Sequence, residues 1–167
     1  MSNQKLNHEE AAAANRTAVR RLYDECFNQG RLEVADQLVA PRFAITGPGG
    51  AGGGGALGPE AFKANARQLL AGFPDIQFTI HDLVAERDRV AVYWTWEGKH
   101  SGAFATIAPT GRKVRQEGMV LYHFEEGKAA QARAFFDRLN VMQQLGAAAP
   151  LPDSRPAGAA AQGRPSL

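Results

Sequence analysis

Four strand-like segments follow one another in the second half of the chain, and no connection between them is long enough to contain a helix. They cover residues 74–81, 90–100, 113–124 and 130–136. Turns at Arg87-Asp88 and at Glu126-Gly127-Lys128 join the first pair and the last pair. Parallel neighbours need a long crossover that is usually helical, so this spacing predicts a mostly antiparallel sheet.

The segments on either side of the strands have helical patterns. Residues 9–29 carry apolar side chains at helical spacing, namely Val19, Leu22, Tyr23, Cys26 and Phe27. Gly30 supplies a C-terminal stop. Shorter helices are expected over 32–39, from the Gly58-Pro59-Glu60 start to Phe73, and over 138–146, with a short strand at 43–46. Together these elements predict an α+β fold, a cone in which N-terminal helices pack on a curved, mostly antiparallel sheet.

Composition limits the classes of protein that this chain can belong to. Its 167 residues, 44% hydrophobic and 22% charged, suit one globular domain, which we place at residues 9–146. We expect a flexible tail at 1–8 and a disordered Ala/Pro-rich tail at 147–167. A net charge of +2 gives no basis for nucleic-acid binding, and no apolar run has the roughly 20 residues of a membrane span. The single cysteine, Cys26, excludes an intrachain disulfide and favours the cytoplasm.

Strand alternation predicts which side chains lie beneath the helices. The more apolar parity sets are Val90, Val92, Trp94, Trp96 and His100; Val114, Gln116, Gly118, Val120, Tyr122 and Phe124; and Ala130, Ala132, Ala134 and Phe136. Three inward alanines leave space, which a ligand cavity requires. The alternatives are that Trp94 and Trp96 are plain core residues, and that the alanines accommodate a crossing helix.

Two residues are candidates for acid/base catalysis. His100 stands at a strand end and has a ring that titrates near neutral pH, although a hydrogen-bonded structural histidine is the alternative. Asp137 follows the alanine-lined strand, where partial burial would raise its pKa into the range of a general base. Its alternative role is the N-cap of the closing helix. His81 and His123 fall on the outer face, so we set them aside.

Other inward polar groups are candidates for substrate binding. Gln116 has an amide that can orient a ligand carbonyl, while Tyr122 and Tyr23 have phenols that can donate to an oxyanion. Trp94, Trp96, Ala134 and Phe136 complete the predicted binding surface. No metal-ligand spacing is present, and the glycine run at 47–55 lacks the Lys-Ser/Thr ending of a phosphate loop. That run is a loop that either gates a cavity or merely links two elements.

Three short motifs carry a resemblance to a known family. They are Gly98-Lys99-His100-Ser101-Gly102, Pro109-Thr110-Gly111-Arg112 and Gln144-Leu145-Gly146. With the order of the strands, they make residues 15–146 similar to the SnoaL-like branch of the NTF2-like superfamily. The resemblance implies a deep apolar pocket, a hydrophobic small-molecule substrate, no cofactor or metal, and homodimers or higher homo-oligomers built on the sheet. It also implies the activity of the family's polyketide cyclases, which close a ring by an intramolecular aldol reaction.

The catalytic residues of those cyclases do not carry over to this chain. The family's acid/base aspartate falls on Ala134, and its helper glutamine and histidine fall on Gly118 and Val120. Our first hypothesis is therefore an enzyme of secondary metabolism that cyclises or isomerises a polyketide-type or epoxide substrate. It would use His100 as the acid/base group, with Asp137 or Gln116 and Tyr122 polarising the substrate. The second is a non-catalytic small-molecule carrier of the same fold, and the third is an interaction protein.

Overall fold

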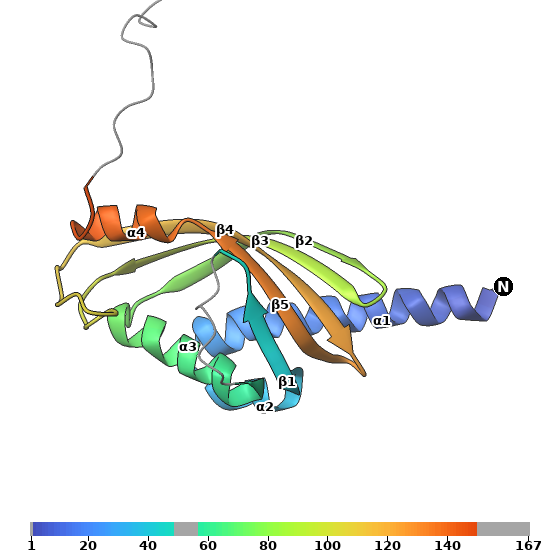
Figure 1. Cartoon of the computed structure of the whole chain (residues 1–167). Coiled ribbons are helices and arrows are strands. Elements are labelled where there is room, and N and C mark those ends of the chain that lie inside the picture. The colour runs from blue at the N-terminus through green and yellow to red at the C-terminus, as the bar shows by residue number, and fades with distance from the viewer. Residues whose placement is uncertain (1, 49–56, 150–167) are drawn as a thin grey trace, which may run out of the picture.

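The computed structural model describes residues 2–48 and 57–149, in which a curved sheet covers three helices (Figure 1). The helices are α1 (Ser2–Arg21), α2 (Ala35–Leu38), α3 (Gly58–Gly72) and α4 (Arg138–Leu145). The strands are β1 (Val39–Thr46), β2 (Gln77–Glu86), β3 (Arg89–Lys99), β4 (Lys113–Glu125) and β5 (Lys128–Phe136). The predicted α+β class, the four strands and the closing helix are confirmed.

The sheet has the strand order β1-β5-β4-β3-β2. Its four consecutive strands pair antiparallel, as their short connections require, and β1 joins the edge by pairing parallel with β5. In Figure 1 the helices α1, α2 and α3 lie on one side of the sheet, and α4 closes one end. The core therefore fills the space between the helices and the inner face of the sheet.

The first helix differs from its prediction at both ends. We expected this helix to begin at Glu9, after a frayed tail. It begins at Ser2 instead, so residues 2–8 are helical. Four consecutive alanines at 11–14 are strong helix formers, and extending an existing helix costs little. At the other end the α-helix stops at Arg21 and continues as a π-helix over Leu22–Phe27, before Gly30 ends the segment with φ of 69°.

The π-helix brings one turn of aromatic residues to the inside of the molecule. Leu22, Tyr23, Cys26 and Phe27 are all buried, as the helical spacing predicted. A π-turn contains one more residue than an α-turn, and such turns are frequent at functional sites. In this chain the turn holds Tyr23 and Phe27 against the ring of Phe78 from β2.

Strand parity predicted the inner face of β3 and β4 correctly. Val90, Val92, Trp94 and Trp96 are buried, and the inward set of β4 alternates with exposed or half-buried residues along the strand. One position in β5 is wrong, because a bulge between His123 and Phe124 of β4 adds a residue to its partner strand. Ala129 takes the buried position, and the predicted Ala130 is only half-buried.

Three other expectations have a limited outcome. Most of the glycine run and of the tail at 147–167 lie at positions 49–56 and 150–167, outside the described residues. None of the helices described here is long and apolar enough to cross a membrane.

Met119 and Phe135 are cross-strand neighbours on the outer face and are about half exposed. The homo-oligomer built on this face stays a prediction.

Candidate functional site

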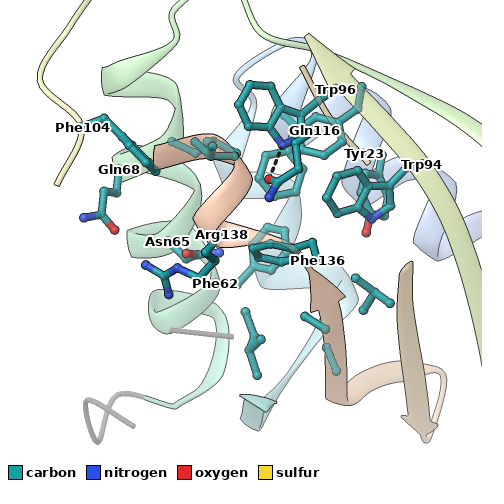
Figure 2. Close-up of a pocket in the computed structure, with 18 of the residues that line it drawn as sticks. Tyr23, Phe62, Asn65, Gln68, Trp94, Trp96, Phe104, Gln116, Phe136 and Arg138 are labelled. Carbon is teal, nitrogen blue, oxygen red and sulfur yellow. Dashed lines mark hydrogen bonds between the residues drawn. The ribbon is translucent and has the colours of Figure 1, made fainter. Parts of the chain in front are cut away.

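A cavity of about 410 Å³ lies between the inner face of the sheet and the helices α3 and α4. This volume is in the range of small-molecule sites. Its wall is mostly apolar and includes Phe27, Phe43, Phe62, Phe78, Phe104 and Phe136. Every residue predicted to bind substrate lines it, namely Tyr23, Trp94, Trp96, Gln116, Tyr122, Ala134 and Phe136. Figure 2 labels Tyr23, Trp94, Trp96, Gln116 and Phe136 among them.

Small residues on neighbouring strands create this space. Ala132 and Ala134 of β5 line the cavity, and Val120 of β4 stands directly opposite Ala134. Gly118 is covered by the indole of Trp94, because a Cβ at that position would lie 2.7 Å from the ring. The positions where the family resemblance puts polar helpers are thus occupied by apolar groups that pack against one another.

Two tyrosine hydroxyls meet at the cavity wall. Tyr23 Oη lies 3.3 Å from Tyr122 Oη, and both side chains are buried. Burial raises the pKa of Tyr122 to about 12, and burial followed by the neighbouring Tyr122 raises the pKa of Tyr23 well above its ordinary value. Both phenols are therefore neutral near pH 7. A hydroxyl pair that shares one hydrogen bond keeps a second hydrogen, which can be donated to a ligand.

Trp94 adds another donor beside this pair. Its Nε1 is buried and meets no acceptor with hydrogen-bond geometry among the described residues, although the indole N–H is close enough to the Tyr23 hydroxyl to offset part of the rise in that phenol's pKa. Figure 2 shows the indole next to Tyr23. A buried donor without a partner costs about 1–3 kcal/mol. A carbonyl oxygen of a ligand in the cavity would recover that cost.

Gln116 is more constrained than its predicted role requires. Its Oε1 accepts a hydrogen bond from Trp96 Nε1 at 3.0 Å, and its Nε2 donates to the main-chain oxygen of Asp137 at 2.9 Å. One amide hydrogen is left for a ligand. The main function of this side chain in the structure is to hold the start of α4 against β4.

The predicted position of His100 at the cavity is wrong. The ring is fully buried, but it packs against Phe73 and Phe104 and does not line the cavity. Its Nδ1 accepts a hydrogen bond from the main-chain nitrogen of Thr110 at 3.1 Å. The strand β3 ends at Lys99, and the His100 main chain then pairs with Arg112, which turns the ring toward the end of α3. This geometry agrees with the structural alternative for His100.

Asp137 also lies outside the cavity lining. It is exposed at the start of α4, where its Oδ1 accepts a hydrogen bond from Asn140 N at 3.0 Å. The alternative role as an N-cap is therefore confirmed. A carboxylate in this position satisfies a free helical amide.

Substitution of Asp137 separates a cap from a catalytic base. Asp137→Ala is expected to lower the free energy of unfolding by about 1 kcal/mol, because the amide of Asn140 loses its acceptor. Asp137→Asn keeps a good cap and is expected to leave stability nearly unchanged. Urea unfolding of both variants measures this. Both roles allow a stable asparagine variant, so turnover separates them: a catalytic base requires Asp137→Asn to be inactive, whereas a cap leaves it active.

The cavity lining contains no carboxylate and no imidazole among the residues that the structure describes. Nor do these residues form any group of three or more His, Cys, Asp or Glu that could hold a metal ion. The polar lining consists of neutral phenols, indoles and amides, together with one cation, Arg138. Such a surface can donate hydrogen bonds to an oxygen but cannot abstract a proton near pH 7.

Besides apolar wall residues, the sequence analysis missed three polar lining residues, which are Asn65, Gln68 and Arg138. Asn65 had a detectable signal, because it stands three residues after Phe62 and four before Leu69 on the apolar face of α3. Arg138 had none, because the start of α4 reaches the cavity only through the tertiary fold.

A curved sheet with helices on its concave side and an apolar cavity between them is characteristic of the NTF2-like fold, and solved structures share it. IdmH from Streptomyces antibioticus is 28% identical, with a TM-score of 0.66 over 79% of this chain and 98% of that chain. TsrD from Streptomyces laurentii has a TM-score of 0.72 over 81% of this chain and 97% of that chain, and its 24% identity supports the fold alone.

Sequence comparison identifies the family. Residues 17–145 match the model of the SnoaL-like polyketide cyclases, and the chain belongs to this family. It is also 30% identical over 130 residues to aklanonic acid methyl ester cyclase AcmA of Streptomyces galilaeus, a match that covers 77% of this chain and 88% of that protein.

Proposed function

We propose that this protein closes a ring in a largely apolar, polyketide-derived substrate, and that it does so without a side-chain base. The observation that supports this is the set of donors at the cavity wall: the Tyr23–Tyr122 hydroxyl pair and the unpartnered Trp94 N–H. Donors fixed in an apolar cavity stabilise negative charge on a carbonyl oxygen more strongly than water does.

The reaction is an intramolecular aldol addition. Hydroxide from solvent removes a proton from the carbon next to the substrate carbonyl and becomes water, while the hydroxyl pair and Trp94 hold the enolate oxygen. The enolate carbon then forms a bond to a second carbonyl carbon, and the resulting alkoxide takes a proton from water, which regenerates hydroxide. The cavity contributes by folding the chain of the substrate so that the two reacting carbons meet.

The pH dependence of turnover tests this mechanism. With aklanonic acid methyl ester, the substrate in the name of the relative from S. galilaeus, the logarithm of the rate is expected to rise with unit slope from about pH 6 to about pH 9. The reason is that no described lining group titrates in that window to act as base. Chromatography of the cyclised product measures the rate. A plateau above pH 7 would mean that a side chain takes the proton.

The described part of the cavity wall contains no base, which also favours a second candidate, a carrier that binds the same kind of molecule without changing it. A carrier predicts that the compound binds and is recovered unchanged at every pH in the series above. Recovery of unchanged ligand from a stable complex would therefore contradict ring closure and support the carrier.

A further inference from the structure

The rim of the cavity carries a group of polar side chains that the proposed ring closure does not use. Asn65 and Gln68 extend from α3, and Arg138 extends from the first residue of α4. In Figure 2 these three side chains lie on one side of the cavity, and Tyr23 and Trp94 lie on the opposite side. We name Asn65, Gln68 and Arg138 the rim triad.

Arg138 is free to bind a ligand. It is exposed, and within the described residues its guanidinium forms no ion pair and no hydrogen bond. The neighbouring carboxylate of Asp137 is engaged with Asn140 N, whereas Arg67 on α3 is paired, its Nη1 lying 3.7 Å from Glu60 Oε2. No other charged side chain lines this cavity among the residues described.

Helix stability does not explain an arginine at this position. Arg138 occupies the first turn of α4, directly after the N-cap, and that turn contains no acidic residue. The positive end of a helix dipole disfavours a cation there and favours an anion. A residue that breaks a local rule in this way commonly serves a site.

The chemistry of the rim triad matches one kind of group. A guanidinium presents paired N–H donors that fit the two oxygens of a carboxylate, and the amides of Asn65 and Gln68 supply further donors. Their positions three residues apart put both amides on the same side of α3. An apolar ligand body in the cavity would also exclude water beside the guanidinium, which strengthens the charge interaction.

We propose that the rim triad binds a free carboxylate on the substrate, remote from the carbonyl that is held by Tyr23, Tyr122 and Trp94. This inference rests on the proposed function and specifies its substrate class: a polyketide-derived molecule with an apolar body, a reacting carbonyl at the inner end and an ionised acid at the rim. Aklanonic acid methyl ester, in which the acid is esterified, is then a test substrate for ring closure that leaves the rim triad unoccupied. Arg138 sets which molecules bind and in which direction they enter.

A matched pair of probes tests the proposal. Anthraquinone-2-carboxylic acid and its methyl ester share one tricyclic body with ring carbonyls, and only the acid is charged at pH 7. Titration calorimetry on the full chain is expected to give a dissociation constant about tenfold lower for the acid than for the ester. The ratio of the two dissociation constants, ester over acid, is expected to fall to about one in Arg138→Gln. It is expected to be kept in Arg67→Gln, which alters a matched exposed arginine outside the cavity lining. Raising the salt concentration from about 0.05 M to about 0.5 M should also reduce this ratio in the unaltered protein.

Each outcome of this titration has a definite meaning. Equal binding of acid and ester by the unaltered protein overturns the carboxylate site but leaves the cavity proposal standing. If Arg138→Gln keeps the preference for the acid over the ester, the carboxylate site is overturned as well. That outcome is expected if the arginine stem merely covers the apolar wall. Failure of both probes to bind overturns the cavity as a ligand site together with the rim triad. Thermal unfolding of Arg138→Gln is expected to show no loss of stability, which excludes misfolding as the cause of a changed ratio.

Discussion

Replacing Ala134 with aspartate is expected to raise the rate of ring closure about 100-fold at pH 7, because it supplies the base that the cavity lacks. Ala134 lines the cavity and is 4% exposed, opposite Val120 of the neighbouring strand. Burial raises the pKa of a carboxyl group there above its ordinary value, toward the range where it is an effective base. The same burial is expected to cost about 2–3 kcal/mol of unfolding free energy. The rate is measured with aklanonic acid methyl ester.

The control for this experiment is Ala134→Asn, which has the same shape and polarity but cannot take a proton. It is expected to lose similar stability and to gain no rate. The aspartate variant should also change the pH profile, so that the rate stops rising above the pKa of the new carboxyl group. A folded Ala134→Asp protein with an unchanged rate, or an equal gain in the asparagine variant, would contradict the proposal that the missing base limits this enzyme.

Alkaline unfolding is the second large effect that we expect. The pKa of Tyr122 is raised from 10.0 to about 12 in the folded protein, and that of Tyr23 is raised as well. Because the unfolded chain loses these protons first, the stabilisation is complete below pH 10 and is lost as the pH rises through the folded pKa. For Tyr122, the rise in pKa from 10.0 to about 12 corresponds to about 3 kcal/mol of unfolding free energy, which is lost as the pH rises from about 10 to about 12.

Urea unfolding in steps from pH 8 to pH 12 measures this loss. The double variant Tyr23→Phe, Tyr122→Phe is expected to have a flatter stability profile above pH 10, since neither phenylalanine ionises. Tyr93→Phe is the comparison variant. That tyrosine is on the outer face, and its hydrogen bond to the exposed Glu117 at 3.0 Å raises its pKa, but solvent screens this exposed pair, so the variant is expected to change the profile much less than the double variant does. If the double variant loses stability above pH 10 as steeply as the unaltered protein, the buried hydroxyl pair is not the cause.

Much of the fold could be predicted because it depends on short-range patterns. The parity of β3 placed Trp94 and Trp96 on the inner face, and Gly30 ended the first helical segment. These outcomes follow from alternation along a strand and from the left-handed conformation that glycine tolerates. Ala130 was misplaced because the bulge in β5 interrupts the alternation, and no residue type in that strand marks a bulge.

The candidate site could be predicted only in part. The seven residues that were predicted to bind substrate were found in the lining because each of them follows a helical or strand period. His100 follows the same period but lies beyond the end of β3, where the alternation no longer sets the direction of a side chain. Arg138 was missed because it begins a short helix whose approach to the cavity depends on Gln116, a residue 22 positions earlier in the chain.

The sequence alone determined the order of the elements, the inward faces of the central strands, and the absence of a carboxylate at position 134. These are properties of one segment at a time, and local backbone geometry is enough to specify them. The tertiary structure decided that Tyr23 meets Tyr122 across 99 positions, that His100 is held away from the cavity, and that Arg138 stands at its rim. Such meetings depend on how helices pack on a curved sheet, and the free energy of that packing belongs to the whole core and to no single segment.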